Sequence, residues 1–303
     1  MLRTFSEIRE IAKSKGERFV VIPGGDDEIS IDTAIDAKKE KIAEPVLVGN
    51  EEKIINTLKN KSIPITNFEL INCSDYLECV DISIKLIKEK KVHIILKGHI
   101  DTSTLLKAIL DKKSGLRGNR LLSDIFIYED PLWENKGGKL IGITDGGITP
   151  SPTLEQKKQI LENAVEVYHK LGYKIPKIAV MSATEKVNPK IQSTIDAISL
   201  VNMNKMGEIK DCIVEGPMAL DVAIHRWCAQ IKGIKSEISG NVDIMLMPSF
   251  EAGNMVAKTF VFYMNRQIGH TIVGAKAPIL INSRTDSPSL KLNSIALSII
   301  TTL

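Results

Sequence analysis

An arginine, a carboxylate and three hydroxyl groups fall within six residues, Ser283-Arg284-Thr285-Asp286-Ser287-Pro288. Residues 277–283 are typical of a strand, and Ser287 followed by a proline is typical of a helix start. Free N–H groups at a helix start attract anions, and Arg284 can hold a phosphate or a carboxylate through two hydrogen bonds. Ser283 adds a hydroxyl group, and Asp286 could accept a proton. The pattern predicts an anion-binding corner, or else a capped helix with a surface Arg–Asp pair.

A second corner of the same design occurs at residues 96–110. A strand-like run ends at Lys97-Gly98, and we expect a helix to begin near Thr102, with Thr104 in its first turn. Gly98 would let the backbone approach a ligand closely. Lys97 supplies a positive charge, and the threonine hydroxyls supply hydrogen-bond donors. A capped helix after a tight turn explains the same residues equally well.

Two further strand ends carry polar residues but no cation. Gly253 and Asn254 lie early in the predicted helix 249–262, where both residue types weaken a helix. We therefore expect another backbone or a ligand to approach Gly253, and Asn254 to offer its amide. Asp145 ends a strand-like run just before two glycines. It could orient a substrate group, or it could simply form a turn.

The elements that must position these corners alternate along the chain. Amphipathic segments separate most of ten short β-rich runs: 18–23, 45–49, 68–72, 92–98, 124–129, 139–145, 177–183, 212–217, 242–248 and 277–283. Apolar strands alternating with helices predict an α/β fold with parallel sheets covered on both faces. Ten strands in one sheet are unusual, so we predict two α/β lobes. The first comprises residues 1–130 and 272–303, and the second comprises residues 131–271.

Two of the predicted helices are well marked. Residues 153–172 open on a capping box formed by Thr153 and Gln156, and they close on a glycine. Residues 74–91 place Tyr76 on one apolar face with Val80, Ile84 and Ile87.

Composition narrows the class of protein. Apolar residues make up 43% and charged residues 25% of the 303 residues, which is typical of a globular protein with a full core. The 40 basic residues are spread among 37 acidic ones, so we expect no nucleic-acid partner. No apolar run is long enough for a bilayer, and the N-terminal stripe predicts a helix rather than a signal peptide. We expect a cytoplasmic protein without a membrane partner, whose four cysteines are reduced thiols.

Familiar catalytic motifs are missing. The sequence contains no G-x-G dinucleotide fingerprint, no phosphate-binding loop of the G-x-x-x-x-G-K-[ST] type and no G-x-S-x-G elbow. Its five histidines do not pair at metal-binding helical spacing. The corners instead suggest a phosphorylated substrate handled by dipoles, hydroxyls and cations, with no metal.

The corners, taken together and in this order, resemble the phosphate acetyl/butyryl transferase family. The matching pieces cover nearly the whole chain: Lys97-Gly98-His99 with Thr102 and Thr104, Ile143-Thr144-Asp145-Gly146, Pro152 to Gln156 with Asn163-Ala164, Glu215-Gly216-Pro217 with Leu220-Asp221, Asp243 to Pro248, Glu251-Ala252-Gly253-Asn254 with Lys258, Val273 to Pro278, and Ser283-Arg284-x-Asp286-Ser287 with Lys291.

The resemblance implies a two-lobed α/β fold of the isopropylmalate dehydrogenase type, with the active site in the cleft between the lobes. It implies the reversible reaction acyl-CoA + phosphate ⇌ acyl phosphate + CoA, without a metal, a permanently bound cofactor or a covalent intermediate. Coenzyme A is then a substrate, and a homo-oligomer is expected. The residues carried over as substrate contacts include Lys258, Ser287 and Lys291. The K-G-H-x-x-T-x-x-L pattern is closer to the butyryl branch than to the acetyl branch.

The implied chemistry requires a proton acceptor. The CoA thiol must lose its proton before it attacks the acyl carbon of the acyl phosphate, and a nearby carboxylate could take that proton. Arg284 and a helix start could hold the phosphate and stabilise the developing oxyanion. The aspartate proposed as the base in acetyl-transferring relatives falls six residues after the motif arginine, where this chain has Leu290. Asp286 and Asp145 are therefore the candidate bases, and a thiolate formed near a lysine is the alternative.

Our leading hypothesis is an acyltransferase that converts butanoyl-CoA and phosphate into butanoyl phosphate and CoA. The first alternative is the acetyl enzyme, because one methylene group is worth only about 1–3 kcal/mol in a pocket. The second is a non-catalytic module that senses acyl-CoA. The third is a metal-dependent decarboxylating dehydrogenase on a related fold, which would need clustered aspartates that the sequence does not show.

Overall fold

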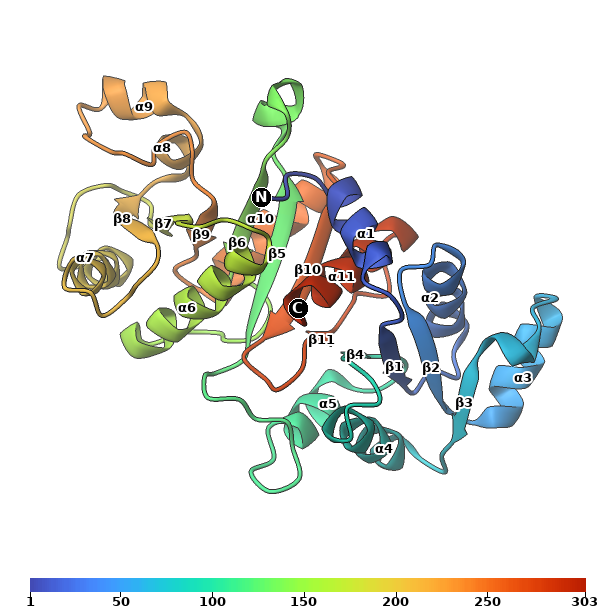
Figure 1. Ribbon diagram of the computed structural model, residues 1–303. Helices are drawn as coiled ribbons and strands as arrows, with labels where there is room; N and C mark the ends of the chain where they lie inside the picture. Colours follow the sequence, from blue (N-terminus) through green and yellow to red (C-terminus); the bar gives the residue numbers. More distant parts are fainter. The chain divides into compact units, whose positions relative to one another are not determined.

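The computed structural model describes residues 1–303 and divides them into two compact units. Unit 1 comprises Met1–Thr4 and Arg120–Ile268, and unit 2 comprises Phe5–Asn119 and Gly269–Leu303. Both are α/β units, as the alternation of strands and helices predicted (Figure 1). None of the helices combines the length and the apolar character that a bilayer-spanning helix needs.

Unit 2 is built on a sheet with the strand order β3-β2-β1-β4-β11-β10. Its strands are β1 (Phe19–Pro23), β2 (Glu44–Gly49), β3 (Glu69–Asn72), β4 (Ile94–Leu96), β10 (Ile268–Val273) and β11 (Ile279–Leu280). Its helices are α1 (Phe5–Ser14), α2 (Glu28–Lys39), α3 (Glu51–Asn60), the short η1 (Ile65–Asn67), α4 (Tyr76–Lys88), α5 (Thr102–Ile109) and α11 (Pro288–Thr301). All neighbours are parallel except β10, which is antiparallel to β11. The carboxyl ends of β1, β4 and β11 therefore meet at one edge.

Unit 1 has the strand order β5-β6-β9-β7-β8. These strands are β5 (Ser123–Glu129), β6 (Leu140–Thr144), β7 (Lys177–Met181), β8 (Ile213–Met218) and β9 (Ile244–Leu246). The helices are η2 (Pro131–Lys136), α6 (Leu154–Lys170), α7 (Gln192–Lys205), α8 (Leu220–Ile224), α9 (Arg226–Ile231) and α10 (Phe250–Phe262). Only β5 is antiparallel to its neighbour, β6, whereas β6, β9, β7 and β8 run parallel. Each unit thus adds one antiparallel pair to the parallel sheets that we predicted.

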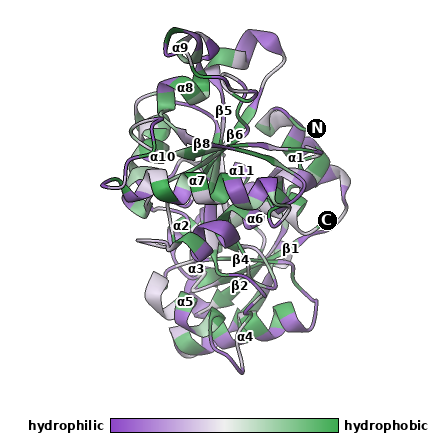
Figure 2. Cartoon of the chain, turned by 90° about the vertical axis from the view of Figure 1, so that its left-hand side faces the viewer, coloured by the Kyte–Doolittle hydropathy of each residue, from purple (hydrophilic) through white to green (hydrophobic).

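The helices bury one face each where the sequence is amphipathic. In α4 the buried residues include Val80, Ile84 and Ile87, and Figure 2 shows hydrophobic and hydrophilic residues mixed along this helix. We expected Tyr76 to share this face, but it does not. It is the first residue of the helix, and 44% of it is exposed. Its ring instead lies edge-on to the His99 ring, with 6.0 Å between the ring centroids.

A disulfide joins Cys73 to Cys79 in unit 2, across the corner between β3 and α4. Our prediction of reduced thiols was therefore wrong for these two cysteines. Residue 73 follows the strand and residue 79 lies in the first turns of the helix, so the chain brings their Cα atoms to 5.6 Å, within the range for a disulfide. Cys212 and Cys228 are free thiols.

Candidate active site

A small cationic pocket lies at the carboxyl edge of β4 and β11, over the first turn of α2. We call it the unit 2 pocket. Its polar lining includes Lys97, His99, Asn282, Ser283, Arg284 and Lys291, together with Asp27 and Ser30 of α2. The space open to the centre of a water-sized sphere is about 40 Å³, which on this measure is room for about three water molecules. The pocket therefore has the size of a small oxyanion rather than of a large organic ligand.

Three cations surround this space. Lys97 is half-buried, and its Nζ donates to the carbonyl oxygens of Gly98 at 3.2 Å and of Ile100 at 2.8 Å. Burial, followed by the nearby guanidinium of Arg284, lowers the pKa of Lys97. Lys291 is only 9% exposed. The lining holds one carboxylate, from Asp27, so positive charge is in excess and an anion would be attracted.

Arg284 is exposed and lies at the mouth of the unit 2 pocket. Its Nη2 donates to Nδ1 of His99 at 3.3 Å. His99 is also the ring on which Tyr76 packs. The guanidinium therefore has a side-chain neighbour that holds one of its nitrogens, while its remaining N–H groups can meet a ligand.

The loop that carries Arg284 is organised by the polar residues around it. Asp286 is buried, and its Oδ2 accepts the N–H of Ser283 at 2.8 Å. Ser287 caps α11 as predicted, because its Oγ accepts the N–H of Leu290 at 3.2 Å. Asp286 thus closes the turn that presents Ser283 and Arg284. Such a role would leave its carboxylate less suited to act as a base.

Gly98 is explained by a close approach of two backbone segments. A Cβ atom at Gly98 would lie 2.3 Å from the carbonyl oxygen of Gly24, at the corner after β1. The neighbour of Gly98 in this structure is therefore backbone of the same unit. Thr102 and Thr104 lie in the first turn of α5 and do not line the unit 2 pocket.

Asp145 organises a different corner, in unit 1, after β6. Its Oδ1 accepts N–H groups of Gly147 at 2.7 Å and Ile148 at 3.0 Å, and its Oδ2 accepts that of Thr149 at 2.9 Å. Burial raises the pKa of Asp145 to about 6, and the neighbouring Asp124 adds to the rise, whereas the backbone donors oppose it. The carboxylate is occupied by the turn that it forms. This geometry favours a positioning role for Asp145.

The start of α10 packs directly on this corner. A Cβ atom at Gly253 would lie 2.3 Å from the carbonyl oxygen of Asp145, so the close approach that we expected at Gly253 is made by backbone. Asn254 Nδ2 donates to the carbonyl oxygen of Gly146 at 3.1 Å. Lys258 lies one turn further along α10, with its Nζ 5.8 Å from the centre of the Phe262 ring. Asp145, Gly253 and Asn254 thus form one cluster in unit 1.

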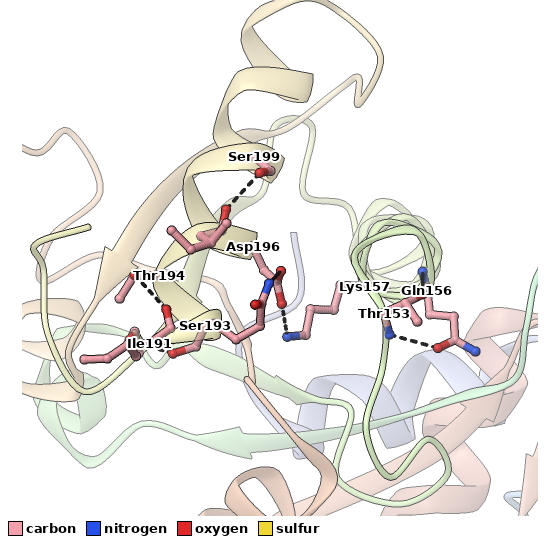
Figure 3. Close-up of polar contacts among 11 residues, drawn as sticks. Thr153, Gln156, Lys157, Ile191, Ser193, Thr194, Asp196 and Ser199 are labelled. Carbon is pink, nitrogen blue, oxygen red and sulfur yellow. Dashed lines mark hydrogen bonds and ion pairs between the residues drawn. The ribbon is translucent and has the colours of Figure 1, made fainter. Parts of the chain in front are cut away.

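Polar contacts also fix α6, the helix that follows the Asp145 corner in the chain. The capping box of α6 is present as predicted, because Thr153 and Gln156 each bind the backbone N–H of the other. One residue further on, Nζ of Lys157 lies 2.6 Å from Oδ2 of Asp196 on α7, and both side chains are more than nine-tenths buried. Figure 3 shows Lys157 reaching from α6 to Asp196. The pair fixes the start of α6 relative to α7.

Sequence reasoning missed four polar residues of the unit 2 pocket: Asp27, Ser30, Thr33 and Asn282. Asp27 caps α2 by accepting the N–H groups of Ile29 and Ser30. The sequence pattern that could have indicated Asp27 is a strand followed by Gly24-Gly25 and two aspartates, which resembles the other strand–helix corners. Asn282 had no such signal. Both polar atoms of its amide are buried without a hydrogen-bond partner, which is unusual and is consistent with a group that meets a ligand.

Comparison with known proteins identifies the family. The model of the family described as "Phosphate acetyl/butaryl transferase" matches residues 3–94 and 78–299. The phosphate butyryltransferase of Clostridium acetobutylicum is 35% identical over 98% of this chain and 98% of its own length. The phosphate acetyltransferase of Thermotoga maritima is 36% identical over 95% of this chain and 96% of its own.

A solved structure agrees with the sequence relatives. The branched-chain phosphotransacylase of Enterococcus faecalis V583 superposes with a TM-score of 0.83 at 29% identity, covering 94% of this chain and 99% of its own. The fold is of the isopropylmalate dehydrogenase type, as the resemblance implied. Because the family model and the curated relatives span nearly the whole chain, the chain belongs to the phosphate acetyl/butaryl transferase family and is a phosphate acyltransferase that uses CoA as a substrate.

Proposed function

We propose that this chain catalyses butanoyl-CoA + phosphate ⇌ butanoyl phosphate + CoA. The observation that carries the proposal is the unit 2 pocket, in which Lys97, Arg284 and Lys291 surround a space of about 40 Å³. That space matches the phosphate that is substrate in one direction and leaving group in the other. The identity to the butyryltransferase of Clostridium acetobutylicum supports the choice of acyl group.

The cations would act mainly by stabilising negative charge on the phosphate. In the direction of acyl-CoA synthesis, the CoA sulfur attacks the acyl carbon, the C–O bond to phosphate breaks, and negative charge grows on the departing phosphate. Arg284 at the mouth and Lys97 and Lys291 deeper in the lining would stabilise that charge, and the first turn of α2 adds the positive end of its dipole. Ser283 can donate its hydroxyl to a phosphate oxygen. Ordered cations of this kind contribute without reorganising during the reaction.

We infer that the CoA thiol loses its proton to solvent water, rather than to Asp286 or Asp145, before the thiolate attacks the acyl carbon. Both carboxylates accept backbone N–H groups of the loops that they organise, so protonating either would weaken its own loop. A thiolate stabilised by the excess of cations is the simpler route. Leu290, where acetyl-type relatives would have an aspartate, is buried and apolar, in keeping with this proposal.

The remaining contacts of the proposed site are predictions. We propose that Gly98 and Ser287 shape the phosphate corner and that Thr102 and Thr104 contact CoA or phosphate. In unit 1, Asn254, Gly253 and Lys258 are proposed to bind CoA or the acyl group. We also propose that the enzyme is a homo-oligomer.

A second acyl preference has comparable support. The Thermotoga maritima acetyltransferase is as similar to this chain as the butyryltransferase is, at 36% against 35% identity. Acetyl-CoA is therefore the alternative substrate, and the Enterococcus faecalis relative adds branched acyl groups to the set worth testing.

One assay separates these substrates. The purified protein is incubated with phosphate, a chelator and one of acetyl-, butanoyl- or isobutanoyl-CoA, and thiol release is followed. We expect the highest kcat/KM with butanoyl-CoA, with a preference of roughly 10-fold or more over acetyl-CoA for two additional methylene groups. Higher kcat/KM with acetyl-CoA would make the acetyl reaction the function, and no thiol release from any substrate would refute the proposal.

A further inference from the structure

A larger cavity lies in unit 1, at the edge opposite Asp145. It opens at the amino ends of β6, β7 and β9, which run parallel and in register, with Ile244 opposite both Gly142 and Ile178. The space open to the centre of a water-sized sphere is about 300 Å³, on the order of twenty water molecules. An inorganic ion would be loose in such a space, whereas an organic ligand of ordinary size would fill it.

The lining of this cavity is positively charged. It contains Arg3, Lys139, Lys174 and Lys177 but only one carboxylate, Asp243, so cations outnumber anions by 4 − 1 = 3. The carboxylate of Asp243 is already engaged, because its Oδ1 lies 2.9 Å from Nζ of Lys139 and its Oδ2 accepts the backbone N–H of Lys177. Lys139 and Asp243 are both more than nine-tenths buried. They form the floor, and Lys174 and Lys177 add two further positive charges to the lining.

Flat and apolar side chains form the rest of the wall. Trp133 of η2, Tyr173 and Ile175 line the cavity. Nζ of Lys139 lies 5.2 Å from the centre of the Trp133 ring, a cation–π distance that holds the indole against the floor. Ile175 is 51% exposed. The wall thus offers an indole and an aliphatic surface next to an excess of positive charge.

We propose that this cavity is a second ligand site, distinct from the unit 2 pocket, for an organic anion that carries a flat ring, such as a nucleoside monophosphate. The ring packs against Trp133 and Ile175, and the anionic group binds to Lys174 and Lys177. Stacking on an aromatic side chain is worth about 1–3 kcal/mol for a base, and the cations add charge-assisted hydrogen bonds. A ligand with only a ring would leave the lysines without an anion, and a ligand with only an anionic group would leave Trp133 and Ile175 uncovered.

Tryptophan fluorescence tests the proposal directly. The chain has two tryptophans, so Trp227→Phe leaves Trp133 as the only indole emitter. We expect AMP to change its emission saturably below about 1 mM, and adenosine or inorganic phosphate to bind at least about tenfold more weakly, because each lacks one part of the ligand. CoA carries the same adenosine phosphate group, so it is titrated in parallel to decide whether a free nucleotide or CoA binds more tightly.

Charge variants of the same protein provide the control. Lys174→Ala/Lys177→Ala should weaken AMP binding by about tenfold or more, since two charge-assisted contacts are lost. Its thiol-release activity should stay within about twofold of the parent, because neither lysine lies in the unit 2 pocket. The matched variant Lys186→Ala/Lys190→Ala removes two exposed lysines outside the cavity and should bind AMP normally. An emission that does not respond saturably to AMP, or equal binding by both double variants, would overturn the proposal.

Discussion

Replacing Gly253 by alanine adds one methyl group at the point where α10 meets the corner after β6. The new Cβ would lie 2.3 Å from the carbonyl oxygen of Asp145 and 2.9 Å from Cα of Gly146, whereas ordinary contacts begin at 3.4 Å. The shortfall at the carbonyl is therefore 3.4 − 2.3 = 1.1 Å. Both neighbours are backbone, so no side-chain rotation can relieve the clash, and the helix or the corner must move.

Two opposing effects determine how much the Gly253→Ala substitution lowers the free energy of unfolding. Alanine is favoured over glycine inside a helix by about 1 kcal/mol, whereas overpacking a well-packed contact costs about 1–3 kcal/mol. Because the clash at Gly253 is with backbone, we take the upper end of that range, which leaves a net destabilisation of about 2 kcal/mol. Moving the Asp145 corner by about 1 Å should also lower kcat/KM by about 100-fold if the corner positions substrate.

Urea unfolding followed by circular dichroism, together with the thiol-release assay, measures both effects. With a slope of about 2 kcal/mol per molar urea, the transition of unit 1 should shift down by about 1 M. Thr259→Ala is the matched control, because it also improves helix propensity in α10 but at an exposed position. It should leave the midpoint unchanged or slightly raised. A Gly253→Ala midpoint at or above that of the parent would refute the reasoning, because helix propensity would then outweigh the contact.

Three further perturbations test other parts of the structure. Arg284→Ala should lower kcat/KM for phosphate by about 10- to 100-fold with an unchanged circular dichroism spectrum, because a charge-assisted contact is worth about 1.5–3 kcal/mol; near-normal turnover would remove Arg284 from the site. Lys157→Met should lower the free energy of unfolding by about 3–5 kcal/mol, because the buried Asp196 carboxylate loses its counter-charge, and adding Asp196→Leu should recover most of that loss; equal loss in the single and double variants would contradict this. The folded-state pKa of Asp145, about 6, is above the ordinary aspartate value of 3.8, so the folded state holds this proton to higher pH than the unfolded chain does. Between about pH 4 and pH 6 this group should lower the free energy of unfolding by up to about 3 kcal/mol, a component that Asp145→Asn should lack; parallel pH profiles would show that the pKa is not raised.

Local signals in the sequence were enough for most of the fold. The capping box at Thr153 and the serine–proline start at Ser287 both depend on residues only a few positions apart, and both are present. Strand pairing depends on contacts far apart in the chain. The antiparallel pairings of β5 with β6 and of β10 with β11 therefore carried no comparable local signal.

The candidate site was predictable in its charges but not in its hydrogen bonds. Lys97, Arg284 and Lys291 do line one pocket, because basic residues at the ends of neighbouring parallel strands or at the helix starts that follow them share one edge of a sheet. The same reasoning could not show that the carboxylate of Asp145 is filled by backbone donors. Nor could it find Asn282, whose significance comes from an amide without a partner rather than from a motif. The spacing of Cys73 and Cys79 likewise gave no sign of a disulfide.

The place of β11 between β4 and β10 has a consequence for synthesis on the ribosome. Ile95 of β4 pairs with Ile279 of β11. The ribosome therefore synthesises the pairing partner of β4 279 − 95 = 184 residues after β4 itself. At about 5–20 residues per second this delay is roughly 10–40 s. During that time the edge of β4 has open hydrogen-bonding groups that a strand of another nascent chain could join. Arg284 lies four residues after the end of β11, so the strand that closes this edge also brings the proposed phosphate-binding loop into place.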